Sequence, residues 1–183
     1  MKFKRFKFKK VKSTNNTAIR IIKNLNYKYG MVASEAQLMG RGQYGKIWIS
    51  QKGNLFVSFF HELKNINLSI SKLTKINCLL VKKLLSNYYK KNIEFKKPND
   101  LLIKNRKICG ILQETVSILN NKFLIIGIGI NISKNPKIKN YPTINLNELT
   151  NKPINKSMIE NKLKKIFETN YTKMYKLGNK IIK

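Results

Sequence analysis

Three glycines, Gly40, Gly42 and Gly45, stand close together in the segment E-A-Q-L-M-G-R-G-Q-Y-G-K-I-W-I-S, residues 35–50. Glycine accepts positive φ and lets the backbone approach a ligand, and successive N–H groups in such a loop can form a concave anion site. The spacing also matches the G-x-G-x-x-G dinucleotide fingerprint, which requires a helix after the loop. The residues that follow, 47–49 and 55–60, are β-branched and aromatic and predict strands instead. The glycines therefore indicate a ligand loop with a strand on either side.

Hydrophobic spacing assigns most of the remaining chain. Strands are predicted within residues 1–12 and over 31–36, 93–95, 101–103, 108–116 and 123–130, and helices over 14–29, 68–89, 145–149 and 158–177. Consecutive strands joined by tight turns, such as the turn at Asn105 and Arg106, favour antiparallel pairing. We expect an α+β fold with a mixed, largely antiparallel sheet and helices packed on one side.

The chain has 183 residues, enough for one domain with a substantial core, and a net charge of +30. The basic residues are spread along the sequence, so we favour compositional drift in an A/T-rich genome over a dedicated nucleic-acid surface. A positive field would still attract ATP and an acidic protein. Cys78 and Cys109 lack metal-ligand spacing and read as buried apolar residues in a reducing compartment. No run approaches the roughly 18 apolar residues of a membrane span, and a secretory signal pattern is absent, so we expect a cytoplasmic protein.

Four motifs occur in a fixed order between residues 13 and 131. They are S-T-N at 13–15, G-R-G-Q-Y-G-K-I-W-I-S at 40–50, K-K-P-N-D at 96–100 with K-I-C-G-I-L-Q-E at 107–114, and G-I-G-I-N at 127–131. Together they resemble the catalytic domain of biotin protein ligases. In that family the corresponding patterns are S-T-N, G-R-G-R-x-G-x-x-W-x-S, K-W-P-N-D with K-x-x-G-I-L-x-E, and G-x-G-x-N.

The resemblance implies an ATP-dependent ligase that activates biotin as biotinyl-5'-AMP. The biotinyl group then passes to a lysine of the biotin carboxyl carrier protein of acetyl-CoA carboxylase, a step that supports fatty acid biosynthesis. ATP with Mg²⁺, biotin and the carrier are the expected partners, with no specific nucleic acid and no membrane. We expect residues 1–183 to form one catalytic domain, without an N-terminal DNA-binding domain and without the small C-terminal barrel usual in the family.

Joining a carboxylate to a polyphosphate brings two anions together, so the site needs cations and N–H donors. The resemblance assigns catalysis to Arg41, Lys96 and Lys107. It assigns biotin binding to Ser13, Thr14, Gln37, Gly40, Arg41 and Gly110, and adenylate binding to Gly42, Gln43, Gly45, Trp48, Lys107 and Asn131. For Asp100 we expect a role through Mg²⁺ or in orienting a lysine, and for Glu114 a structural role.

Two positions depart from the family pattern. Gln43 replaces an arginine and keeps hydrogen bonding without the charge, which suggests that biotinyl-adenylate is held less tightly and labels off-target lysines. Lys97 replaces a tryptophan, which alters the packing under the loop. Three alternatives remain open on the sequence: a lipoate ligase or octanoyltransferase of the same fold, a basic RNA-binding protein, and a degenerate, inactive copy.

Overall fold

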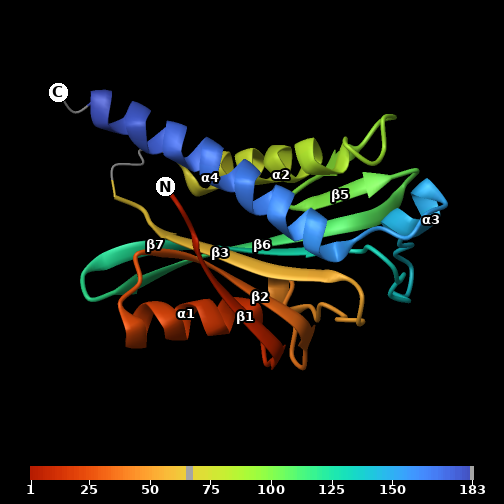
Figure 1. The fold of residues 1–183 in the computed structure, drawn as a ribbon, viewed down its shortest axis with the longest axis horizontal. Helices are drawn as coiled ribbons and strands as arrows, with labels where there is room; N and C mark the ends of the chain where they lie inside the picture. Colours follow the sequence, from red (N-terminus) through yellow and green to blue (C-terminus); the bar gives the residue numbers. More distant parts are fainter. Residues whose placement is uncertain (65–67, 182–183) are drawn as a thin grey trace.

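A seven-stranded mixed sheet forms the centre of the molecule (Figure 1). The computed structural model describes residues 1–64 and 68–181, with side chains to residue 176. The strands are β1 (Lys4–Val11), β2 (Tyr29–Gln37), β3 (Leu55–Glu62), β4 (Glu94–Lys96), β5 (Asp100–Ile103), β6 (Arg106–Ile118) and β7 (Asn121–Ile130). Their order is β1-β2-β3-β7-β6-β5-β4, and β1 pairs parallel with β2 while the other pairs are antiparallel. The predicted α+β class and mixed sheet are confirmed.

Helices cover both faces of the sheet, so the expectation that they pack on one side is wrong (Figure 1). The helices are α1 (Thr14–Leu25), α2 (Ile70–Leu85), α3 (Leu146–Thr150) and α4 (Lys156–Ile181). On one face, α1 packs through Ala18, Ile21 and Ile22 onto β2, β3 and β7. On the other, α2 and α4 cover the larger core. Residues of β2 and β3 contribute apolar side chains to the cores on both faces of the sheet. The sequence pattern of such strands does not show which faces are covered by helices.

Element boundaries differ from the predicted ones where local backbone chemistry intervenes. Helix α1 ends at Leu25 rather than at 29, because Asn26 adopts the left-handed conformation (φ 52°) of a helix C-cap. Residues 47–49 do not form a strand; Ile47 makes only an isolated bridge with Arg41. Within α2, the apolar side chain of Leu79 faces solvent and is 52% exposed. Cys78 and Cys109 are buried free thiols, as predicted.

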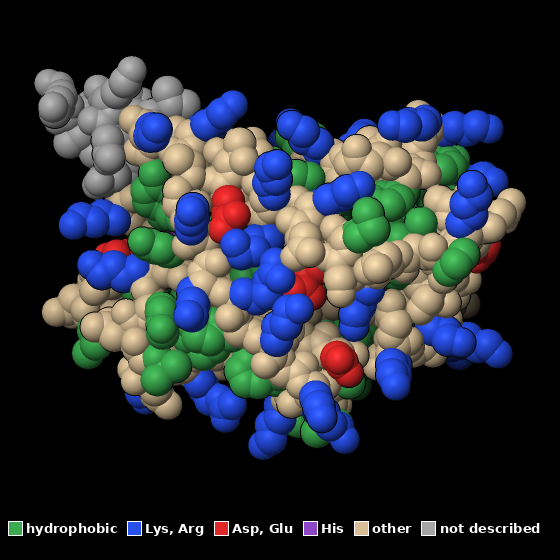
Figure 2. Space-filling model, viewed as in Figure 1, with side chains coloured by type: hydrophobic (Ala, Val, Ile, Leu, Met, Phe, Trp, Pro, Cys, Tyr) green, Lys and Arg blue, Asp and Glu red, His purple; other side chains and the backbone are tan. Residues whose placement is uncertain are grey.

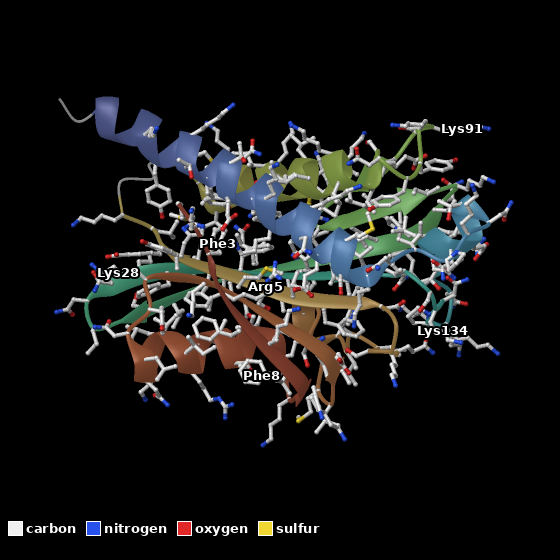
Figure 3. All side chains as sticks on the ribbon, viewed as in Figure 1. Phe3, Arg5, Phe8, Lys28, Lys91 and Lys134 are labelled. Carbon is white, nitrogen blue, oxygen red and sulfur yellow. The ribbon has the colours of Figure 1, made fainter. Side chains whose placement is uncertain are left out.

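The N-terminal strand is attached to the C-terminal helix. The N–H of Phe3 donates to Glu168 of α4 (2.8 Å), and the Phe3 ring packs edge-on against Phe59 and Tyr171. Figure 3 shows Phe3 between the sheet and α4. These contacts place β1, and with it the start of α1, at a defined edge of the sheet.

On the face of the sheet that α1 covers, a row of glycines leaves a space beyond the N-terminus of this helix. Positions 127 and 129 of β7 and 110 of β6 are glycines, and Gly110 pairs directly with Gly129. A Cβ on Gly127 would lie 2.4 Å from Asn15 Oδ1, and one on Gly129 would lie 2.3 Å from Trp48 Cζ2. Larger residues at these positions would fill the space, so the glycines create a hollow in this face of the sheet.

An irregularity between β5 and β6 turns a lysine toward this hollow. The pairing of the two strands shifts between Leu101 and Leu102. As a result Ile108 and Cys109 both enter the core under α2 and α4. Lys107 then lies on the opposite side, beside Gly110. A β-bulge commonly re-aims one side chain in this way.

Candidate active site

The hollow is a cavity of about 570 Å³. It is bounded by the start of α1, the glycine loop, β6, β7 and the segment before α3. Of the residues predicted for the site, it is lined by Ser13, Thr14, Gln37, Arg41, Gly42, Gln43, Trp48, Lys96, Asp100, Lys107, Gly110 and Asn131. Gly40 and Gly45 are not among the lining residues. The tertiary structure thus brings together residues from four separate sequence motifs.

Uncharged polar side chains gather at the end of the cavity near α1. Ser13 caps the helix by accepting a hydrogen bond from the N–H of Asn16. Gln37 Oε1 accepts from both the N–H (2.8 Å) and the hydroxyl (3.1 Å) of Thr14. The buried Ser58 hydroxyl lies 2.8 Å from Thr14 Oγ1 and 2.5 Å from Asn15 Oδ1. These groups fix one another and present both donors and acceptors to a polar ligand.

The glycines of the loop mainly allow close contacts within the loop itself. A Cβ on Gly40 would lie 2.4 Å from the carbonyl oxygen of Trp48, so only glycine allows this close approach. The N–H of Gly42 donates to the Lys46 carbonyl (2.7 Å) and is therefore already engaged. Gly45 has φ 72° and closes the turn. Gly42 therefore has no free N–H group to contribute to the anion site that was expected in this loop.

Trp48 lies over the glycines of the sheet. Its ring atoms would be within 2.6 Å of a Cβ on Gly110 and within 2.3 Å of one on Gly129. The ring also lies 5.1 Å from the Lys107 ammonium, a cation–π contact. Its Nε1 is buried without a hydrogen-bond partner in the described part of the protein. Trp48 is therefore a wall of the cavity rather than a residue of the apolar core.

Positive charge dominates the other end. The basic residues that line the cavity are Arg41, Lys46, Lys96, Lys97, Lys107 and Lys139, whereas Asp100 is the one carboxylate among the described lining residues. Lys107 Nζ lies 2.9 Å from Asp100 Oδ1. Asp100 Oδ2 accepts a hydrogen bond from the Tyr141 hydroxyl (2.7 Å). Burial, together with the bond to Asp100, raises the pKa of Tyr141, so its hydroxyl stays protonated and acts as the donor.

Arg41 extends from the loop to β6. Its guanidinium lies 2.6 Å from Glu114 Oε2, and the side chains are 40% and 27% exposed. The same oxygen accepts from Asn15 Nδ2 (2.6 Å). Through Glu114 the loop and the start of α1 share one carboxylate, and a structural role for this residue stays a prediction.

Asn131 lies at the end of β7, where its side chain is buried. Its Nδ2 donates to the Lys107 carbonyl (3.2 Å), and its N–H donates to the Ile108 carbonyl (2.9 Å). Asn54 contacts it and also accepts from three N–H groups of residues 132–134. This network sets the path of the chain as it leaves β7 toward the cavity.

The residues that sequence reasoning did not assign to the site include Asn15 and Tyr141, which line the cavity, and Ser58, which contacts its lining. Asn15 belongs to the S-T-N motif. Ser13 and Thr14 of this motif were assigned to the site, and the same motif could have identified Asn15. Ser58 is a polar residue within the apolar strand 55–60, which is the signature of a buried hydrogen-bonding group. Tyr141 follows 10 residues after the last motif and carries no pattern of its own.

Lys and Arg side chains are distributed over the whole face seen in Figure 2 rather than gathered in one patch. Across residues 1–64 and 68–181, no helix combines the length and apolar character needed to cross a bilayer. Within the same ranges, no group of three or more His, Cys, Asp or Glu side chains is arranged to hold a metal.

Residues 7–131, which include most of the sheet and of the cavity lining, match the model of the biotin/lipoate A/B protein ligase family. The chain belongs to this family. Within it, the chain is 30% identical over 126 residues to the bifunctional ligase/repressor BirA of Bacillus subtilis. That match covers 68% of this chain and 39% of the relative, so the chain spans about two fifths of its length.

Solved structures show the same similarity. The biotin protein ligase of Aquifex aeolicus in complex with biotin and ATP superposes with a TM-score of 0.79 at 27% identity, covering 94% of this chain and 72% of that one. The P. falciparum protein LipL1 in complex with lipoate has a TM-score of 0.58 at 16% identity, with coverage of 94% and 63%. The second match reflects the shared fold alone.

Proposed function

We propose that this chain condenses biotin with ATP and transfers the activated biotinyl group to a lysine of a carrier protein. The observation that carries the proposal is the cavity itself, in which six basic side chains and one carboxylate adjoin a cluster of neutral donors and acceptors. The cluster at Ser13, Thr14 and Gln37 suits the ureido group of biotin. The cationic end suits the polyphosphate of ATP.

In the first step an oxygen of the biotin carboxylate attacks the α-phosphorus of ATP. The bond from that phosphorus to the bridging oxygen breaks, and pyrophosphate leaves. Arg41, Lys96 and Lys107 offset the repulsion between the two anions and stabilise the charge that develops on the phosphoryl oxygens. In the second step the neutral amine of the acceptor lysine attacks the acyl carbon, and AMP leaves.

Magnesium enters this proposal only with ATP. Asp100 is the one carboxylate that lines the described cavity, and its two oxygens face Lys107 and Tyr141. This arrangement fits the role of orienting a lysine better than the role of a metal ligand. Mg²⁺ is commonly held by substrate phosphates with few protein ligands, and bound there it would neutralise phosphate charge.

We propose a biotin carboxyl carrier protein of acetyl-CoA carboxylase as the acceptor, and the cytoplasm as the site of action. The net charge of +30 supports attraction to an acidic partner and to ATP. Gln43 lines the cavity, a position that supports the prediction that its lack of charge allows release of biotinyl-adenylate. Equal off-target labelling by the wild type and Gln43→Arg would contradict it.

The first experiment measures biotin-dependent exchange of labelled pyrophosphate into ATP. We expect wild-type protein to exchange and Lys107→Ala to lose at least about 100-fold, the usual effect of removing one group that stabilises developing charge. Lys91→Ala is the matched control, because Lys91 is exposed and points away from the sheet (Figure 3). Exchange stimulated by lipoate instead of biotin would favour the sister activity. Folded protein that exchanges with neither acid would overturn the proposal.

A further inference from the structure

The segment that carries Tyr141 is held against the start of β6 by its backbone. The N–H of Lys107 donates to the Pro142 carbonyl (2.8 Å), and the N–H of Ile144 donates to the Lys107 carbonyl (3.0 Å). Thr143 forms a parallel bridge with Lys107. Tyr141 is therefore placed beside Lys107 by main-chain hydrogen bonds and not merely by a chance side-chain contact.

The hydroxyl of Tyr141 controls the orientation of Asp100. It donates to Oδ2 (2.7 Å), which leaves Oδ1 facing Lys107 Nζ at 2.9 Å. A carboxylate with one anchored oxygen cannot rotate freely, so the hydroxyl also determines where the ammonium of Lys107 lies. The Lys107 and Asp100 side chains are only 14% and 13% exposed, so water competes little for this pair.

The ring of Tyr141 brings two ammonium groups together. Lys96 Nζ lies 4.4 Å from the ring centroid and Lys107 Nζ lies 5.3 Å from it. The two lysines come from different strands, β4 and β6, and their like charges repel each other. The negative face of an aromatic ring attracts both cations. The ring thus offsets part of the repulsion at the place where an anion is expected to bind.

We propose that Tyr141 is a positioning residue for adenylation, with separate roles for its two parts. The hydroxyl holds Asp100, and through it Lys107, in the geometry needed at the reacting phosphate. The ring gathers Lys96 and Lys107 to receive the polyphosphate of ATP. The inference rests on the proposed function, and it adds a residue that belongs to none of the four motifs.

Two substitutions separate the roles. Tyr141→Phe keeps the ring and removes the hydroxyl, so we expect kcat for biotin-dependent pyrophosphate exchange to fall about 10-fold while KM for ATP changes less than about twofold. Tyr141→Leu removes the ring as well as the hydroxyl. Because the cation–π contacts are then lost, KM for ATP should also rise about 5- to 10-fold. Tyr29→Phe, at the exposed start of β2, is the control and should match the wild type.

Calorimetric titration of the same proteins with ATP, without biotin, gives a second readout. We expect Tyr141→Phe to bind ATP like the wild type and Tyr141→Leu to bind it about 5- to 10-fold more weakly. Circular dichroism verifies that each variant is folded. Wild-type kcat in folded Tyr141→Phe, or wild-type ATP binding in Tyr141→Leu, would overturn the inference. Titrations as expected, with no exchange stimulated by biotin or lipoate, would reject the proposed ligase and leave the role of the ring supported.

Discussion

Glu114 on β6 and Arg41 in the glycine loop form an ion pair, with 2.6 Å between the guanidinium and Oε2. The same oxygen accepts a hydrogen bond from Asn15 at the start of α1. One carboxylate on the sheet therefore orients two side chains from separate elements at the mouth of the cavity. The strand therefore fixes the position of the loop arginine.

Glu114→Gln is expected to weaken biotin binding more than it weakens the fold. The pair with Arg41 is partly exposed, and such pairs contribute at most about 1 kcal/mol to stability. Arg41 and Asn15 both lose an anionic partner, so KM for biotin should rise about fivefold, close to the effect of 1 kcal/mol. Exchange kinetics and urea unfolding measure the two effects. Glu94→Gln, an exposed carboxylate on β4, is the control; an unchanged KM in Glu114→Gln would contradict the role given to the pair.

Gly129→Ala is expected to displace the indole of Trp48. A Cβ there would lie 2.3 Å from ring carbon Cζ2, and a contact that short forces the ring to move. Overpacking of this kind costs about 1–3 kcal/mol. Because Trp48 is the chain's single tryptophan, its fluorescence reports the change directly, and we expect a red-shifted emission maximum. Thr115→Ala, an exposed site on β6, should leave the spectrum as in the wild type. An unaltered spectrum in Gly129→Ala would place the indole elsewhere.

His61 is expected to make the protein acid-sensitive. Burial between β3 and α4 lowers the pKa of His61 from 6.5 to about 4. The unfolded chain therefore binds this proton more readily than the folded one, so the stabilisation is fully present above pH 6.5 and is lost as the pH falls toward 4. At about 1.4 kcal/mol for each unit, the loss is at most about 3 kcal/mol.

The measurement is the free energy of urea unfolding at several pH values between 7 and 4. His61 is the chain's one histidine, so comparison with His61→Gln isolates its contribution from that of the carboxylates. The variant should be less stable at pH 7, because the contact with the Tyr171 ring (4.4 Å between centroids) is altered, and should have a shallower pH slope. Parallel slopes in the two proteins would refute the assignment.

The sequence predicted most of the strands and helices because their hydrophobic spacing is a local property. It missed the second helical layer, since residues that face α1 and residues that face α2 and α4 are equally apolar along β2 and β3. It also took residues 47–49 for a strand, because their β-branched and aromatic composition outweighed the constraint imposed by the loop.

For the candidate site, the sequence by itself determined the motifs, and with them Arg41, Lys107 and most other residues that line the cavity. Only the tertiary structure decided how these residues meet. The shift in pairing between β5 and β6 turns Lys107 toward the cavity, and the chain after β7 brings Tyr141 onto Asp100. Such relationships join residues tens of positions apart through strand register and main-chain hydrogen bonds. No local pattern records them, because register depends on the partner strand as much as on the strand itself.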